Sequence, residues 1–374
     1  MLKERAYWLA WSKIPGVGPV LLKRVQQHFG TLAEAWKAPA MTLGEVDGFG
    51  IRLINVVKQK RSQLNPETLL EEYTQKNANF WTPADPEYPR LLLEIPSPPP
   101  VLSYRGQVQL QENQGITPIV GIVGTRNPTE HGLRWTYKIS KALARHGFTI
   151  VSGMAVGIDA QAHRGCLEAG GRTIAVLGTG VDVVYPRSNN KLYHQIQEQG
   201  LVLSEYEAGT SPNRRNFPPR NRIIAGLSRA VFVMEAPQKS GSLITARYAN
   251  DFGRDVYILP NSPDYQQSRG CLRLLNQGAG IIIEEGELLE MLGAIPNIDP
   301  VRQLSLFPQD KSKPIPELEA DLAKVYDAIS TEQIPFDVIV QESGLTAGTV
   351  SAALLQLELM GLVTQVPGMR YRRC

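Results

Sequence analysis

Short apolar runs alternate with longer amphipathic stretches from residue 115 to about residue 293 of this chain of 374 residues. The apolar runs are rich in β-branched side chains at consecutive positions, which is typical of strands covered on both faces. Strands that alternate with helices in this way build a doubly wound, mostly parallel sheet. The sequence therefore predicts an α/β fold with a central, extended Rossmann-type domain. The predicted strands are residues 119–124, 149–152, 173–177, 201–204, 230–235, 255–259 and 279–284, and the predicted helices are residues 131–145, 160–168, 190–199, 221–227, 242–252 and 270–276.

The pattern changes on both sides of this central block, which we place at residues 115–293. Residues 1–80 consist of short helical patterns and Gly-rich turns, so we predict an all-α N-terminal domain. Residues 81–114 are rich in proline and are expected to form an extended connector. A second Pro-rich stretch, residues 294–317, is expected to be a linker to a small independent unit at residues 318–374.

The composition limits the partners and the compartment. The net charge is only +3, so a nucleic-acid site must be a local basic patch. The three cysteines form no C-x-x-C pair, which argues against a zinc site and a disulfide framework and favours a reducing cytoplasm. No stretch approaches the ~20 apolar residues that span a bilayer, and no signal peptide is recognisable. We expect a cytoplasmic protein without membrane contact, cofactor or metal.

Small and hydroxyl-bearing residues follow most of the predicted strands. Ligands of such sheets bind outside the carboxyl ends of the strands, and small residues with free N–H groups at helix starts favour phosphate. One such turn needs no ligand, because Gly and Ser also make tight turns, but several turns at one sheet edge indicate a phosphate-binding crevice. The turns contain Gly124-Thr125-Arg126, Ser152-Gly153-Met154, Gly178-Thr179-Gly180, Ser204-Glu205 and Ser240-Gly241-Ser242.

An arginine-rich segment without acidic residues lies between Ala208 and Met234. Guanidinium forks bind phosphate oxygens in pairs, and Phe217 within this segment offers a stacking surface for an unpaired base. The alternative is a solvated charged loop with Phe217 as its hydrophobic anchor. Candidate DNA-binding residues in the segment are Arg214, Phe217, Arg220, Asn221 and Arg222.

Four other residues have side chains that could carry chemistry. Asp159 and His163 lie four apart, but no further ligands have metal-site spacing, so we expect a helix N-cap and a packed side chain. Glu205 and Glu235 are either a catalytic pair in the crevice or single carboxylates that orient nearby arginines. The chain has neither a G-x-x-x-x-G-K-[ST] loop nor a G-x-G-x-x-G turn after the first strand, which disfavours a P-loop ATPase and a dinucleotide dehydrogenase.

An ordered series of motifs in the central block resembles the DprA/Smf family of DNA-processing proteins, and the flanks also fit, so the resemblance covers nearly the whole chain. The motifs are Gly124-Thr125-Arg126, Ser152-Gly153-Met154-Ala155-Val156-Gly157-Ile158-Asp159 with His163, Thr173-Ile174-Ala175-Val176-Leu177-Gly178, Ser204-Glu205-Tyr206, Phe217-Pro218-Pro219-Arg220-Asn221-Arg222-Ile223-Ile224-Ala225-Gly226-Leu227-Ser228 and Ser240-Gly241-Ser242-Leu243-Ile244-Thr245-Ala246.

The resemblance implies a DNA-binding protein and not an enzyme. It implies that Arg126 holds a phosphate and that Arg214 and Phe217 occupy the basic and aromatic positions of a family motif. It also implies that the protein protects incoming single-stranded DNA, helps to load the recombinase RecA during natural transformation and recombination, and dimerises through the Rossmann-type domain. Departures from the family pattern are Val156 in place of an arginine, Asn261 in place of a glycine, and Leu272 in place of an asparagine.

The flanking domains resemble other DNA-binding modules. Residues 14–19 and 46–51 resemble a pair of helix–hairpin–helix units in a SAM-like domain, whose N–H groups can grip a phosphate without reading sequence. The glycines there could equally serve only to shape a helical hairpin, and Asp47 would repel phosphate. The tail resembles a winged helix, but its would-be recognition helix, residues 346–360, has no Lys or Arg. We therefore expect the tail to contact protein or to regulate.

The leading hypothesis is a single-stranded DNA-binding protein of low sequence preference. The rival is a nucleotide-binding hydrolase of the lysine-decarboxylase-like Rossmann class, which has a Pro-Gly-Gly-x-Gly-Thr motif followed by Glu. The matching segment here, residues 240–245, has no Glu at that place. A third hypothesis, a scaffold that binds only proteins, leaves the arginine segment unexplained.

Overall fold

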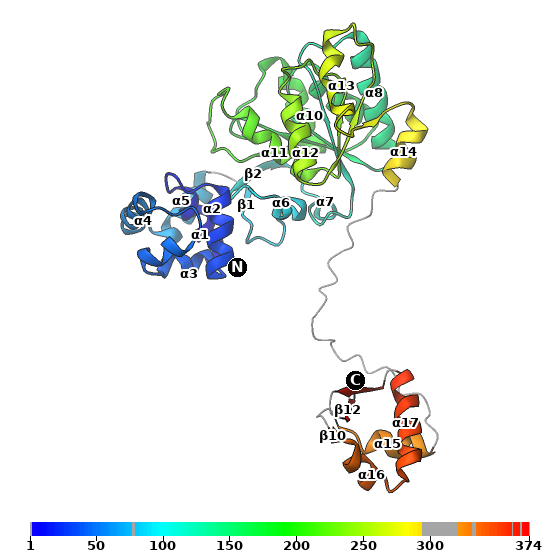
Figure 1. Cartoon of the computed structure of the whole chain (residues 1–374). Coiled ribbons are helices and arrows are strands. Elements are labelled where there is room, and N and C mark those ends of the chain that lie inside the picture. Colours follow the sequence, from blue (N-terminus) through cyan, green and yellow to red (C-terminus); the bar gives the residue numbers. More distant parts are fainter. Residues whose placement is uncertain are drawn as a thin grey trace. The chain divides into compact units, whose positions relative to one another are not determined.

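The computed structural model describes residues 2–76, 79–293, 320–330, 334–360, 362–366 and 369–373. The chain divides into two compact units, Met1–Pro300 and Val301–Cys374, and each is described by itself (Figure 1). The N-terminal helices and the sheet thus belong to one compact unit. The predicted linker, residues 294–317, lies outside the described residues.

The first unit contains a sheet whose described strands confirm the predicted doubly wound topology. Strands β3 to β9 run parallel to one another, whereas β2 pairs antiparallel with both β6 and β1 at one edge. The order of the strands reverses between β3 and β7, which makes this pair the topological switch point. The order across the sheet is β1 (Phe80–Trp81), β2 (Leu102–Gly106), β6 (Leu201–Ser204), β5 (Thr173–Val176), β4 (Thr149–Ser152), β3 (Ile119–Val123), β7 (Ala230–Val233), β8 (Asp255–Ile258) and β9 (Gly280–Ile281).

Helices cover both faces of the sheet, which explains why its strands are apolar at consecutive positions. In β3, Ile119 and Val123 join the core on one face, and Val120 and Ile122 join the core on the other. The first face packs against α6 (Arg90–Glu94), α11 (Phe217–Leu227), α12 (Ser242–Asp251) and α13 (Arg269–Leu275). The second face packs against α8 (Glu130–Arg145), α9 (Ile158–Glu168), α10 (Asn190–Gln199) and α14 (Glu285–Gly293).

Two segments differ from the expectation. The expected connector, residues 81–114, is not simply extended, because it supplies β2, α6 and the short helix α7 (Leu110–Asn113). Three of its prolines lie before α6 and four lie between α6 and β2, whereas Leu92 and Leu102 are fully buried. The high proline content of the segment made these buried leucines hard to recognise in the sequence. The last strand, expected over residues 279–284, is confined to β9.

The N-terminal part of this unit is all-α, as predicted. Its helices are α1 (Leu2–Ser12), α2 (Pro19–Phe29), α3 (Leu32–Lys37), the 3-10 helix η1 (Ala40–Glu45), α4 (Ile51–Gln63) and α5 (Pro66–Lys76). In the predicted hairpins, Gly16 has φ +85° and packs on Leu53 of α4, and Gly48 has φ +100° and packs on Leu21 of α2. Each hairpin therefore packs on the helix that follows the other hairpin.

Arg24 of α2 forms an ion pair with Asp47 in the second hairpin, at 2.8 Å between Nη1 and Oδ2. The pair compensates the carboxylate that we expected to repel phosphate. A phosphate contact at these hairpins stays a prediction.

The described residues of the second unit form three helices and a small sheet, the elements of a winged helix. They are α15 (Ala320–Asp327), α16 (Phe336–Ser343), α17 (Ala347–Leu359), and a sheet in the order β10 (Ile334–Pro335), β12 (Arg370–Arg373), β11 (Val363–Val366). The helix at the recognition position, α17, carries no basic residue. Among the described residues, no single helix is long and apolar enough to cross a bilayer, and only the bent pair α16–α17 meets that test by length and composition.

Candidate nucleic-acid interface

A cavity of about 540 Å³ lies where the Rossmann principle places a ligand, outside the carboxyl ends of β3 and β7. The turn after β3, the start of α11 with the segment before it, and the loop after β7 form its walls. The predicted site residues that line it are Gly124, Thr125, Arg126, Arg214, Phe217, Arg220, Asn221, Ser240, Gly241 and Ser242. The structure thus brings most of the predicted residues together.

Glu235, which follows β7, fixes the wall formed by the β3 turn. Its backbone oxygen accepts a hydrogen bond from the Thr125 N–H at 2.7 Å. Its carboxylate accepts from the N–H of Thr129 at 2.8 Å and from the Thr129 hydroxyl at 2.5 Å. Glu235 is buried and anchors the start of α8. It therefore orients a helix start, and neither of the two expected roles, catalysis or arginine orientation, fits these contacts.

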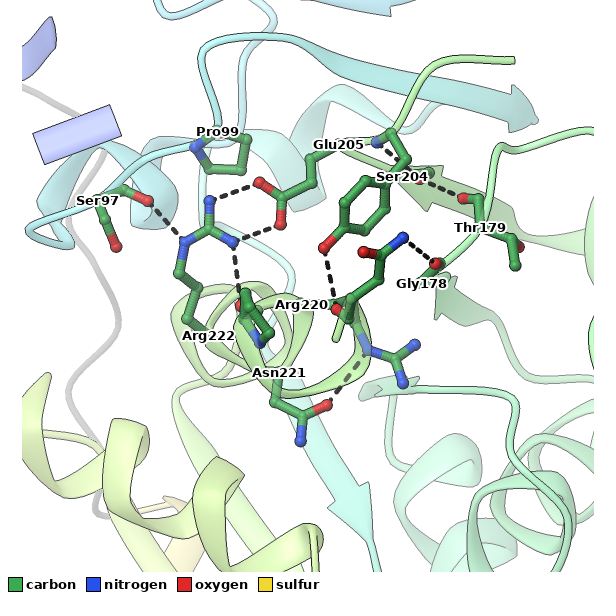
Figure 2. A network of polar contacts seen from close by, with 12 residues as sticks. Ser97, Pro99, Gly178, Thr179, Ser204, Glu205, Arg220, Asn221 and Arg222 are labelled. Carbon is green, nitrogen blue, oxygen red and sulfur yellow. Dashed lines mark hydrogen bonds and ion pairs between the residues drawn. The ribbon is translucent and has the colours of Figure 1, made fainter. Parts of the chain in front are cut away.

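Helix α11 begins earlier than predicted, at Phe217 instead of residue 221. Prolines at the next two positions fit, because the first turn of a helix needs no backbone N–H donors there. The Asn216 amide donates to the Gly178 carbonyl at 3.2 Å, and the Tyr206 hydroxyl donates to the Asn216 carbonyl at 3.0 Å (Figure 2). These bonds hold the start of α11 against the ends of β5 and β6.

Arg220 supplies a buried positive charge to the cavity. Its side chain donates to the carbonyls of Gly153, at 3.1 Å, and Val176. It also donates to the Asn221 side chain at 3.2 Å (Figure 2). Burial lowers the pKa of Arg220 to about 10, so it remains charged at neutral pH. A Cβ on Gly153 would lie 2.6 Å from its Nη2, which explains the glycine there.

Asp159 balances this charge and is not the expected N-cap. It is the second residue of α9, whose N-cap is Gly157. Its carboxylate accepts hydrogen bonds from the N–H groups of Gly153 at 3.2 Å and Ala155 at 3.4 Å, so it organises the loop after β4. Burial raises the pKa of Asp159 to about 6, although the Arg220 charge acts in the opposite direction.

His163 is a packed side chain, as predicted. It is fully buried, and its Nδ1 lies 2.6 Å from the Thr173 hydroxyl. Burial lowers its pKa to about 3, so the ring is neutral. Within the described ranges, no group of three or more His, Cys, Asp or Glu residues could hold a metal ion.

Aromatic rings form the side of the cavity near the β5 end. Phe217 is half-buried, and its ring stacks on Tyr185 with centroids 5.6 Å apart and an interplanar angle of 29°. The guanidinium carbons of Arg126 and Arg220 lie 5.7 and 5.9 Å from the Phe217 centroid. Sequence reasoning missed Tyr185. The available signal was an aromatic residue before Pro186, shortly after the Gly178-Thr179-Gly180 turn.

Three predicted residues do not line the cavity. Gly153 lies beside it, in a smaller adjoining pocket. Ser152 is fully buried and donates to the Ile122 carbonyl at 2.6 Å. Arg222 is 5% exposed, forks onto the Glu205 carboxylate at 2.5 and 2.7 Å and donates from Nε to the Ser97 carbonyl at 3.0 Å (Figure 2). Positions 220 and 222 lie about 200° apart around a helix, so only one of them can face the cavity. The direct DNA contacts predicted for Ser152 and Arg222 are therefore not retained.

These features define a Rossmann-type domain with a basic cavity at its switch point, joined to a winged helix. The family profile described as DNA recombination-mediator protein A matches residues 79–293, and the profile described as DprA winged helix domain matches residues 309–369. The chain belongs to the DprA/Smf family of DNA-processing proteins.

Individual relatives agree with this assignment. The chain is 56% identical to the protein Smf of Synechocystis sp., over 99% of each chain, and 40% identical to the DNA processing protein DprA of Streptococcus pneumoniae, over 67% of this chain and 86% of that one. The X-ray structure of DprA from Streptococcus pneumoniae superposes with a TM-score of 0.67 at 35% identity, covering 76% of this chain and 97% of that one. A structure of DNA processing protein A from Helicobacter pylori, described for its single-stranded DNA binding mode, gives a TM-score of 0.51 at 31% identity, covering 57% and 95%.

Proposed function

We propose that this chain binds single-stranded DNA across the cavity at the carboxyl ends of β3 and β7, with little sequence preference. The observation that carries the proposal is that three arginines line one cavity beside aromatic rings: the exposed Arg126 and Arg214 and the buried Arg220. Arginine forks hold phosphates, and exposed rings accept any base. The likeness to the Helicobacter pylori protein supports the same ligand.

We further propose that the chain acts as a binding protein and not as an enzyme. Asp159, the carboxylate that lines the cavity, is engaged with the loop after β4. Two carboxylates that follow neighbouring strands are also engaged, Glu205 with Arg222 and Glu235 with Thr129. The rival hydrolase needs a carboxylate free to act on a nucleotide.

The family resemblance supports the biological setting that we propose. The protein protects incoming single strands, helps to load the recombinase RecA during natural transformation and recombination, and acts in the cytoplasm. It forms a homodimer through the Rossmann-type domain. The name of the Streptococcus pneumoniae relative, DNA processing protein DprA, fits this setting.

Fluorescence anisotropy with labelled oligo-dT, against a matched duplex, tests the proposed function. We expect tighter binding to the single strand. Contacts from three arginines give a salt slope of about −2, so raising the salt from 50 to 200 mM should weaken binding roughly 15- to 20-fold. Absence of single-strand binding, together with release of a base from nucleoside monophosphates, would instead favour the hydrolase.

The affinity for single-stranded DNA is also expected to rise on the order of 5-fold as the pH falls from about 7.5 to 5. The pKa of Asp159 is about 6, so the carboxylate is charged above this pH and neutral below it. Neutralising the carboxylate leaves the Arg220 charge uncompensated. It also removes the repulsion between the carboxylate and a bound phosphate, which at about 4 Å in water costs ~1 kcal/mol. Binding of an anion therefore takes up a proton at Asp159. Anisotropy titrations across this pH range measure the effect.

The control for this prediction is Asp159→Asn. The variant should bind at pH 7.5 about as tightly as the wild type does at pH 5, and its pH profile should be flat. His163 does not contribute, because its pKa of about 3 keeps it neutral throughout. An unchanged pH profile in the variant would assign the response to another group.

A further inference from the structure

The outward face of α8 carries a row of basic side chains, Arg134, Lys138, Lys141 and Arg145, which we call the α8 ridge. Their spacing of four, three and four residues places them within about 60° of one another around a helix. The buried residues of α8 lie on the opposite side. Arg134, Lys138 and Arg145 are exposed, and Lys141 is half-buried. The ridge is therefore open to a ligand in solvent.

The ridge concentrates the positive charge of the chain. Helix α8 contains the four ridge cations and one acidic residue, Glu130, so with His131 neutral its net charge is +3. The whole chain of 374 residues has the same net charge. Arg134 and Arg145, at the two ends of the ridge, form no ion pair with any residue that the structure describes. A face with this excess of charge attracts a polyanion.

Two acidic side chains from neighbouring helices approach the ridge. Glu285 of α14 lies 3.9 Å from the Lys138 ammonium, and the two side chains are 36% and 53% exposed. Glu168 of α9 accepts a hydrogen bond from the Tyr137 hydroxyl at 2.6 Å. Ion pairs between exposed side chains are weak, so a phosphate can replace Glu285 beside Lys138 at little cost.

The ridge starts next to the cavity. The turn after β3, which contains Arg126 in the cavity wall, leads through the N-cap residue Thr129 into α8. Glu235 fixes Thr129 by a hydrogen bond at 2.5 Å, so the start of α8 is held against the end of β7. A strand that leaves the cavity over the start of α8 meets Arg134 first and the other ridge residues in chain order.

We propose that the α8 ridge holds the backbone of the single strand outside the cavity and thereby lengthens the DNA-binding site. This inference rests on the proposed function and assigns the path of the strand. Arg134 and Arg145 are eleven positions apart, so the ridge is about 16 Å long at 1.5 Å per residue. A stacked strand with one phosphate every ~3.4 Å presents about five phosphates over that length.

The position of the ridge favours DNA over an acidic protein. An acidic peptide would match the charge alone, whereas a strand that already occupies the cavity is held beside the ridge at high effective concentration. Lysine and arginine contacts to phosphates also carry no sequence information, which agrees with the proposed low sequence preference.

The length of the oligonucleotide separates the ridge from the cavity in anisotropy titrations of the full-length protein. Oligo-dT of about 6 nucleotides reaches the cavity alone, and oligo-dT of about 20 nucleotides also covers the ridge. Arg134→Gln/Arg145→Gln should weaken binding of the longer strand roughly 3- to 30-fold at low salt, because exposed charge pairs are individually weak. Its salt slope should fall by about 1.4, the contribution of two phosphate contacts. The affinity for the shorter strand should stay within about twofold of the wild type.

The matched control is Lys191→Gln/Arg273→Gln, which removes the same charge from α10 and α13. Both residues are exposed, and neither lines the cavity or the smaller pocket. This variant should bind both oligonucleotides within about twofold of the wild type. Equal losses in the two double variants would reflect general attraction to the protein and would overturn the inference.

Acetylation of lysines in the wild-type protein, mapped by mass spectrometry, makes the test independent of the folding of any variant. The longer oligo-dT should protect Lys138 and Lys141 and leave Lys191 reactive, and the shorter one should protect none of the three. If the longer strand left Lys138 and Lys141 reactive, or bound the ridge variant as tightly as the wild type, the inference would be wrong and the proposed function would stand. Absence of binding of both oligonucleotides by the wild type would overturn both.

Discussion

Replacing Arg126 with alanine is expected to weaken single-stranded DNA binding roughly 10- to 150-fold, the equivalent of losing a charged hydrogen bond worth ~1.5–3 kcal/mol. Arg126 is exposed directly after β3 and lines both pockets, so its guanidinium can reach a phosphate without rearrangement. Each lost phosphate contact also reduces the salt slope by about 0.7. Anisotropy titrations at several salt concentrations measure both effects.

Arg215→Ala is the matched control for this prediction. Arg215 is exposed and lies next to Arg214 in the same segment, but it does not line the cavity. Its replacement removes the same net charge and should change affinity less than about threefold, as expected for long-range attraction in screened solvent. Equal effects of the two substitutions would contradict a cavity-centred site and point to the N-terminal hairpins.

Replacing Glu205 with glutamine is expected to destabilise the first unit by about 3–5 kcal/mol, because it leaves the buried charge of Arg222 without its partner. The side chains of Arg222 and Glu205 are only 6% and 14% exposed, and both forks of the guanidinium are engaged. Urea denaturation followed by circular dichroism measures the loss. DNA affinity per folded molecule should stay unchanged, because Arg222 does not line the cavity.

The double variant Glu205→Leu/Arg222→Met separates a structural pair from a DNA contact. Replacing both charges with apolar side chains of similar volume removes the desolvation cost together with the attraction, so most of the stability should return. If Glu205→Gln left stability unchanged and altered DNA affinity, Arg222 would have to act on the ligand after all.

The sheet and the position of the cavity could be predicted from the sequence because both follow from local patterns. Consecutive apolar residues mark strands buried on two faces, and parallel strands bring their carboxyl ends to one edge. Gly124, Arg126 and Ser240 could therefore be placed together without coordinates. The same reasoning could not separate Arg220 from Arg222, because that required the start of α11.

Other features depend on contacts between distant parts of the chain, which no local pattern reports. Asp159 holds a loop and faces Arg220 of α11, so helix position alone suggested only an N-cap. Tyr185 stacks on Phe217, which lies 32 residues later in the sequence. The β2 strand could not be predicted for two reasons: prolines precede it, and its pairing partner β6 lies far along the chain.

The pairing of β2 with β6 sets an order of events during synthesis. Ser103 pairs with Ser204, so β2 waits for roughly 100 further residues, or about 5–20 s at typical translation rates. The N-terminal helices contact one another locally and can fold first. Meanwhile the edge of β2 that later pairs with β6 is open, and the prolines that precede β2, together with its short length, are features that discourage pairing with another nascent chain. The proline cluster that made this strand hard to predict thereby disfavours pairing between nascent chains during translation.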